Sequence, residues 1–141
     1  MHFFLNYVAR AILVLFVAPL IGCSKSTGPN RVHVSGDISW KGTPVPSGYV
    51  TFTPDVKKGT SGPQGLAWIK DGKFDTRTEK GRPVVRGSQI ASIYGYDGAN
   101  PSEVHPWGSQ LFSQHQQEVT IGDQESVEVT FTIPDSATRP K

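Results

Sequence analysis

Side chains able to do chemistry are sparse in this 141-residue sequence, and the only cysteine, Cys23, stands out by its position. It closely follows ten uncharged residues, 11–20, and is itself followed by the small and polar residues 24–30. A lone cysteine has no partner for a disulfide within the chain. Polar neighbours on its C-terminal side argue against the alternative of a thiol buried in an apolar segment. We therefore expect Cys23 to act through a modification of its sulfur.

The residues around this cysteine resemble the bacterial lipobox, a cleavage motif in which a small residue precedes a cysteine that accepts diacylglycerol. They are Leu20, Ile21, Gly22 and Cys23. Ten helical residues span only about 15 Å, roughly half a bilayer core, so the segment before them suits a secretory signal better than a membrane span. We predict a lipoprotein signal peptide over 1–22 and a lipidated Cys23. Because Ser24 replaces the Asp that typically retains such proteins at the inner membrane, the outer membrane is favoured.

The other chemically capable residues form no recognisable catalytic or metal-binding pattern. His33, His105 and His115 lack the spacing of metal ligands, the carboxylates are scattered singly, and no G-x-S-x-G motif occurs. We accordingly expect no enzyme activity, no metal and no cofactor. With 14 Lys and Arg against 12 Asp and Glu, the formal charge of +2 gives no electrostatic case for binding nucleic acid.

Three tryptophans offer the best alternative function, because exposed aromatic rings stack on sugars. Trp40 shares its parity with neighbouring apolar residues and is expected in the core, whereas Trp68 lies in a short strand that permits either direction. Trp107 lies in a long irregular segment with two prolines, where we expect exposure. Trp107 and Trp68 are therefore the candidate ligand-binding residues, and a carbohydrate-binding accessory module of the cell envelope is the alternative to a purely structural role.

Alternating apolar and polar residues predict the strands that must position these side chains. Gly36 suggests a bulge in the first strand, Asp71-Gly72 a hairpin turn, and Gly122-Asp123 a second hairpin that closes the chain. No helical stripe occurs after the leader. The predicted strands cover 32–40, 48–53, 66–70, 73–76, 87–96, 118–121 and 126–133. About seven short strands predict an all-β fold, an antiparallel β-sandwich over 31–134, with a flexible tether over 23–30 and a frayed tail over 135–141.

The segment 32–52 resembles the opening of transthyretin-like, or carboxypeptidase-regulatory-like, domains. The matching positions are Gly36, Ile38, Gly42, Pro44, Gly48, Val50 and Phe52, and the later Asp71-Gly72-Lys73-Phe74 is similar to the hairpin of that family. These residues serve turns and packing, so the resemblance implies a fold and not a reaction. The hydrolases of this fold class end in a Tyr-Arg-Gly-Ser-like motif, whereas this sequence ends in 137–141, Ala-Thr-Arg-Pro-Lys. The expected protein is a lipoprotein whose partners are the membrane and an envelope polysaccharide or protein.

Overall fold

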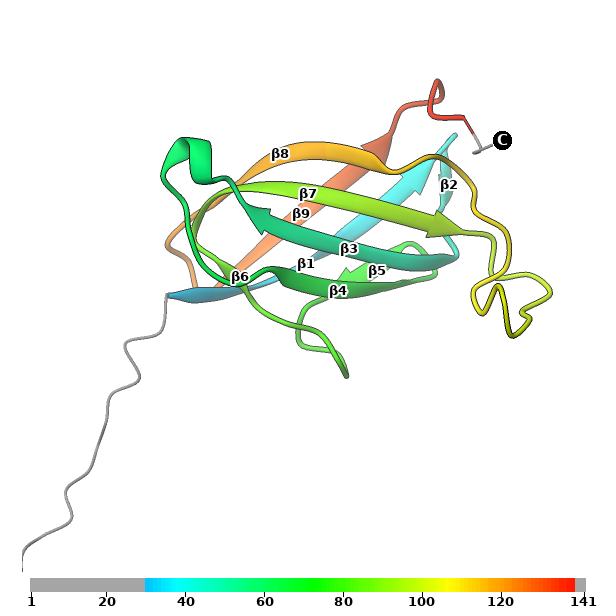
Figure 1. The fold of residues 1–141 in the computed structure, drawn as a ribbon, viewed down its shortest axis with the longest axis horizontal. Helices are drawn as coiled ribbons and strands as arrows, with labels where there is room; N and C mark the ends of the chain where they lie inside the picture. The colour runs from blue at the N-terminus through cyan, green and yellow to red at the C-terminus, as the bar shows by residue number, and fades with distance from the viewer. Residues whose placement is uncertain (1–29, 139–141) are drawn as a thin grey trace, which may run out of the picture.

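The computed structural model describes residues 30–138, which form an all-β domain (Figure 1). Within this range there are nine strands and one short 3₁₀ turn, η1 (Val56–Lys58), and no α-helix. The strands are β1 (Arg31–Trp40), β2 (Thr43–Pro44), β3 (Ser47–Pro54), β4 (Gly65–Lys70), β5 (Lys73–Asp75), β6 (Val84–Val85), β7 (Gly87–Tyr96), β8 (His115–Ile121) and β9 (Ser126–Ile133). The prediction of an all-β fold is therefore confirmed.

The strands form one curled sheet in the order β2-β1-β5-β4-β3-β7-β8, with β6 and β9 also paired to β1. Its neighbours are antiparallel except for β1 and β9, which run parallel over eight residue pairs. Figure 1 shows the curl, with β1 and β9 crossing behind β3 and β7. The prediction that the last two strands form a hairpin is wrong. In the described range β8 pairs with β7, whereas β9 pairs with β1.

The core lies between the two arms of the curled sheet. Phe52 on β3 is fully buried, and its ring centroid lies 6.4 Å from that of Phe131 on β9 and 6.2 Å from that of Phe74 on β5. Burial of such a side chain contributes about 1.5–3 kcal/mol to the stability of the fold, which explains why β9 pairs with β1 and not with β8. Pairing with β1 turns Phe131 and Ile133 inward, where both are buried.

Turn residues explain the local geometry of two predicted features. Asp71 and Gly72 both have positive φ, 51° and 77°, as a two-residue hairpin of type I′ requires. Gly36 does not form the predicted bulge, because β1 pairs with β5 and β9 through this position without a break in register. The missing side chain of Gly36 allows the backbones of β1 and β9 to lie close together, since a Cβ here would lie 1.7 Å from the carbonyl oxygen of Val129.

The start of the predicted tail is held against the domain. The backbone N–H of Ser113 donates to the Thr138 carbonyl at 2.7 Å, and Ala137 packs against the core. Ala137 and Thr138 thus contact the domain, and the last three residues of the predicted tail over 135–141 lie outside the described residues.

Candidate functional site

Strands β3, β4 and β7 lie side by side, and one face of this group carries aromatic residues. Tyr49 on β3 is the register partner of Trp68 on β4 and of Tyr94 on β7. These positions alternate with buried core residues such as Val50 and Ile93. Because successive side chains of a strand point to opposite faces, the three rings form a row on the outer face of the sheet.

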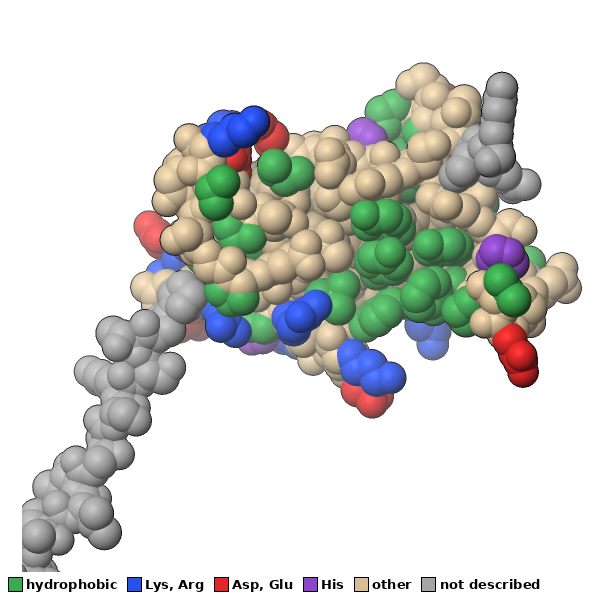
Figure 2. All heavy atoms as spheres, in the orientation of Figure 1, with side chains coloured by type: hydrophobic (Ala, Val, Ile, Leu, Met, Phe, Trp, Pro, Cys, Tyr) green, Lys and Arg blue, Asp and Glu red, His purple; other side chains and the backbone are tan. Residues whose placement is uncertain are grey.

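Tyr96, two residues after Tyr94 at the end of β7, is the fourth aromatic residue of this face, and the long loop after β7 adds a fifth. Trp107 on the loop lies with its ring centroid 5.4 Å from Tyr96, 5.6 Å from Trp68 and 5.8 Å from Tyr49. We call the five residues Tyr49, Trp68, Tyr94, Tyr96 and Trp107 the aromatic face. Figure 2 shows hydrophobic side chains gathered over this part of the sheet.

Asp97 fixes the conformation of the loop that carries Trp107. Its carboxylate oxygen Oδ1 accepts hydrogen bonds from the backbone N–H groups of Ala99 and Ser109, both at 2.9 Å. The backbone N–H of Gly98 donates to the Trp107 carbonyl at 3.0 Å. Gly108 has a φ of 81°, a left-handed conformation that favours glycine. The loop is therefore a built structure that presents Trp107 to the sheet.

The aromatic face is packed within itself and partly open to solvent. Tyr49 and Tyr94 are stacked, with ring centroids 4.6 Å apart and an interplanar angle of 20°, whereas Trp68 meets Tyr49 edge-on. All five residues are half-buried. Burial, followed by the neighbouring phenols of Tyr96 and Tyr94, raises the pKa of Tyr49 above its ordinary 10.0. The Tyr49 hydroxyl thus stays protonated at physiological pH, where it can donate or accept a hydrogen bond.

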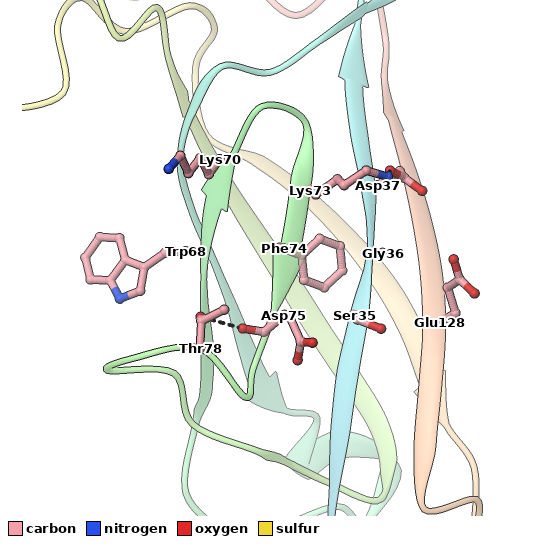
Figure 3. Close-up of a pocket in the computed structure, with 10 residues that line it drawn as sticks. All are labelled: Ser35, Gly36, Asp37, Trp68, Lys70, Lys73, Phe74, Asp75, Thr78 and Glu128. Atoms are coloured by element: carbon pink, nitrogen blue, oxygen red, sulfur yellow. Dashed lines mark hydrogen bonds and ion pairs between the residues drawn. The ribbon is translucent and has the colours of Figure 1, made fainter.

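Two hollows adjoin Trp68, and they give the aromatic face polar neighbours. The first has a volume of about 380 Å³ and lies over β1, β4, β5 and β9 (Figure 3). Its polar lining is Ser35, Asp37, Lys70, Lys73, Asp75, Thr78 and Glu128. The second, of about 340 Å³, is lined by Trp68, Glu79, Lys80 and Trp107. Trp68 therefore lines both hollows, and each of them also has charged side chains in its lining.

Some of the charges around the first hollow are already paired. Lys73 Nζ lies 2.7 Å from Asp37 Oδ1, and this hydrogen bond raises the pKa of Lys73 above its ordinary 10.5. Asp75 is bonded to Arg77 through both the backbone N–H, at 2.8 Å, and the guanidinium, at 3.4 Å. Within residues 30–138, the side chains of Ser35, Lys70 and Glu128 have neither a hydrogen-bond nor an ion-pair partner.

The structure brings together the two candidate ligand-binding residues of the sequence, Trp68 and Trp107, from segments almost forty positions apart. Trp40 packs elsewhere, against Phe112 at 5.6 Å, as its parity predicted. Sequence reasoning missed the three tyrosines of the aromatic face, although Tyr49 alternates with core residues. Only the register of β3, β4 and β7 shows that the tyrosines meet the tryptophans. The lipobox residues and Cys23 lie outside the described residues.

The three histidines do not form a metal site in the described range, where no group of three or more His, Cys, Asp or Glu is placed to hold an ion. His33 lies near Thr76, its Nδ1 being 3.4 Å from the hydroxyl oxygen. No helix among residues 30–138 is both long and apolar enough to cross a membrane.

Comparison of the chain with protein-family models, with curated proteins and with solved structures finds no match. The resemblance to transthyretin-like domains thus stays a prediction, and the function must be argued from the site.

Proposed function

We propose that this chain is a non-enzymatic binding protein of the bacterial cell envelope whose aromatic face binds carbohydrate. The observation that carries the proposal is the convergence of five Tyr and Trp side chains, from three strands and one loop, on one half-exposed surface. A contiguous apolar patch on a soluble domain marks an interaction site. Tyr and Trp combine a large apolar ring with a polar group, as a partly wet binding surface requires.

The composition around the aromatic face favours a sugar as the ligand. A sugar ring has an apolar face of C–H groups, which packs on an aromatic ring, and an edge of hydroxyl groups, which needs hydrogen-bond partners. Trp68 meets both needs, because aromatic rings lie on one side of it and the charged hollow on the other. Binding sites for small ligands combine an apolar surface with a few such polar groups.

The membrane anchor and the finer description of the fold belong to the same proposal. Lipid on Cys23, together with a short tether over 23–30, would hold the domain at the outer membrane, and two or more acyl chains suffice for stable anchoring. A transthyretin-like β-sandwich is supported by the opening strands β1 to β3. It is further supported by the enclosure of one core between β3 and the β1–β9 pair, where Phe52 meets Phe131.

Binding of purified protein to neutral polysaccharides tests the carbohydrate proposal, by retardation in polysaccharide-containing native gels and by calorimetry. We expect Trp68→Ala and Trp107→Ala each to weaken binding by at least about tenfold, or about 1.4 kcal/mol. Trp40→Phe, which alters a tryptophan outside the aromatic face, is the matched control and should bind as wild type does. Absence of binding to every polysaccharide, or unchanged binding in both alanine variants, would overturn the proposal.

Metabolic labelling with palmitate tests the anchor. We expect label on the wild type, none on Cys23→Ala, and the protein in the outer-membrane fraction. Ser24→Asp is the control, because it keeps the thiol and should keep the label while moving the protein to the inner-membrane fraction. A label that persists in Cys23→Ala would show that the anchor is elsewhere or absent.

A further inference from the structure

The register of the sheet places the aromatic face and the charged hollow on one continuous row. Glu128 on β9 pairs with Ser35 on β1, and Ser35 pairs with Asp75 on β5. Between β5 and β4, Phe74 is opposite Ile69 and Lys73 opposite Lys70. Asp75, the last residue of β5, and Trp68 on β4 line the same hollow.

From Trp68 the row continues through Tyr49 on β3 to Tyr94 on β7. One line of outward side chains therefore crosses six strands. Because the sheet curls around the core, this row is bent: it passes over β4 and β5 from the outer face of β3 and β7 to the outer face of β1 and β9 on the other side of the domain. The row has an aromatic half and a polar half, and Trp68 is where they meet.

The polar half offers hydrogen-bonding groups that the fold itself does not use. Within the described residues, the hydroxyl of Ser35, the ammonium of Lys70 and the carboxylate of Glu128 border the first hollow without a hydrogen-bond partner. Figure 3 shows Ser35 and Glu128 on neighbouring strands, with Trp68 and Lys70 extending to the same side of β4. A hydroxyl, a donor and an acceptor are the groups that bind the hydroxyls of sugars.

The charges on this surface discriminate between classes of polysaccharide. Asp37 is paired with Lys73 and Asp75 with Arg77, and the remaining charges of the hollow, Lys70 and Glu128, have opposite signs, so the polar half has no net charge to attract a polyanionic chain. The second hollow likewise holds one charge of each sign, Glu79 and Lys80, so a polycationic chain gains no net attraction either. A surface without net charge suits an uncharged chain.

From this arrangement we infer that the ligand is an uncharged, linear oligosaccharide that lies across the strands. Some of its rings contact the aromatic face, and the next ones bind Ser35, Lys70 and Glu128 in the hollow. The inference rests on the proposed function and adds the length, direction and charge class of the ligand.

Calorimetry with the full chain tests the inference, using oligomers of glucose, mannose, xylose and N-acetylglucosamine, each as disaccharide and hexasaccharide. For the sugar that binds, we expect the hexasaccharide to bind at least about tenfold more tightly than the disaccharide. The double substitution Ser35→Ala with Glu128→Gln should reduce this difference to about threefold or less, because it removes groups that only the longer sugar reaches together with the aromatic face. Glu125→Gln, in the exposed turn before β9, is the matched control, and melting temperatures show that every variant is folded.

The outcomes separate this inference from the proposed function. Equal affinity for both lengths, with binding still abolished by Trp68→Ala, would overturn the extended site and leave carbohydrate binding intact. Tighter binding of galacturonate oligomers than of uncharged ones would overturn the charge class. Binding of none of the sugars, or binding to phospholipid vesicles in their place, would overturn both proposals.

Discussion

Strands β3, β4 and β7 present two faces of opposite character, although the same three segments build both. The inner face consists of aliphatic residues, Phe52 and Gln89, all fully or almost fully buried. The outer face consists of Tyr49, Trp68 and Tyr94, half-buried and covered in part by Trp107. If the outer face served only to be shielded from water, aliphatic side chains under a loop would suffice. Its rings are instead only partly buried, and its tyrosines carry phenol hydroxyls, which distinguishes this face from the core.

The largest difference between the faces should appear when one ring is removed from each. Phe52→Ala leaves a cavity among Phe74 and Phe131 and should lower the free energy of unfolding by about 3–5 kcal/mol. Trp68→Ala should cost clearly less stability, because its side chain is only partly buried, while it weakens sugar binding. Chemical denaturation of both variants measures this contrast, and equal losses of stability would show that the aromatic face is a second core.

An intermediate effect is expected at Asp97, which acts on the aromatic face through the loop. Asp97→Ala removes the acceptor of two backbone hydrogen bonds and should cost about 1.5–3 kcal/mol of stability. It should weaken sugar binding about as much as Trp107→Ala does, and the two substitutions combined should not add. Asp97→Asn keeps an oxygen acceptor and should restore most of the binding. Full additivity in the double variant would mean that Asp97 does not position Trp107.

The smallest effect concerns the phenol of Tyr49 at alkaline pH. Because its pKa is raised in the folded state, folding favours the neutral phenol, and the stability this provides is fully present below pH 10.0. That stability is lost as the pH rises through the raised value. Tyr49→Phe cannot ionise, so its melting temperature should fall less between pH 9 and pH 11 than that of the wild type. Parallel curves for the two proteins would show that the hydroxyl lies in an environment like that of water.

The sequence by itself determined the strands and the direction of most side chains, because alternation is a local property of each segment. It therefore predicted the all-β class, the hairpin at Asp71-Gly72 and the placement of Trp40 against the core. The prediction of a hairpin between the last two strands was wrong for a physical reason. Whether β9 pairs with β8 or with β1 depends on where Phe131 and Ile133 find a core, and that core lies far away along the chain.

For the site, the sequence pointed to Trp68 and Trp107 but not to their neighbours. From the sequence, Tyr49 is an ordinary outward-facing strand residue. The pairing of β3 with β4 and β7 places it between Trp68 and Tyr94. The polar half of the row depends in the same way on the parallel pairing of β1 with β9. Cross-strand register joins residues by hydrogen bonds between distant segments, so tertiary structure alone decided that aromatic and charged side chains share one surface.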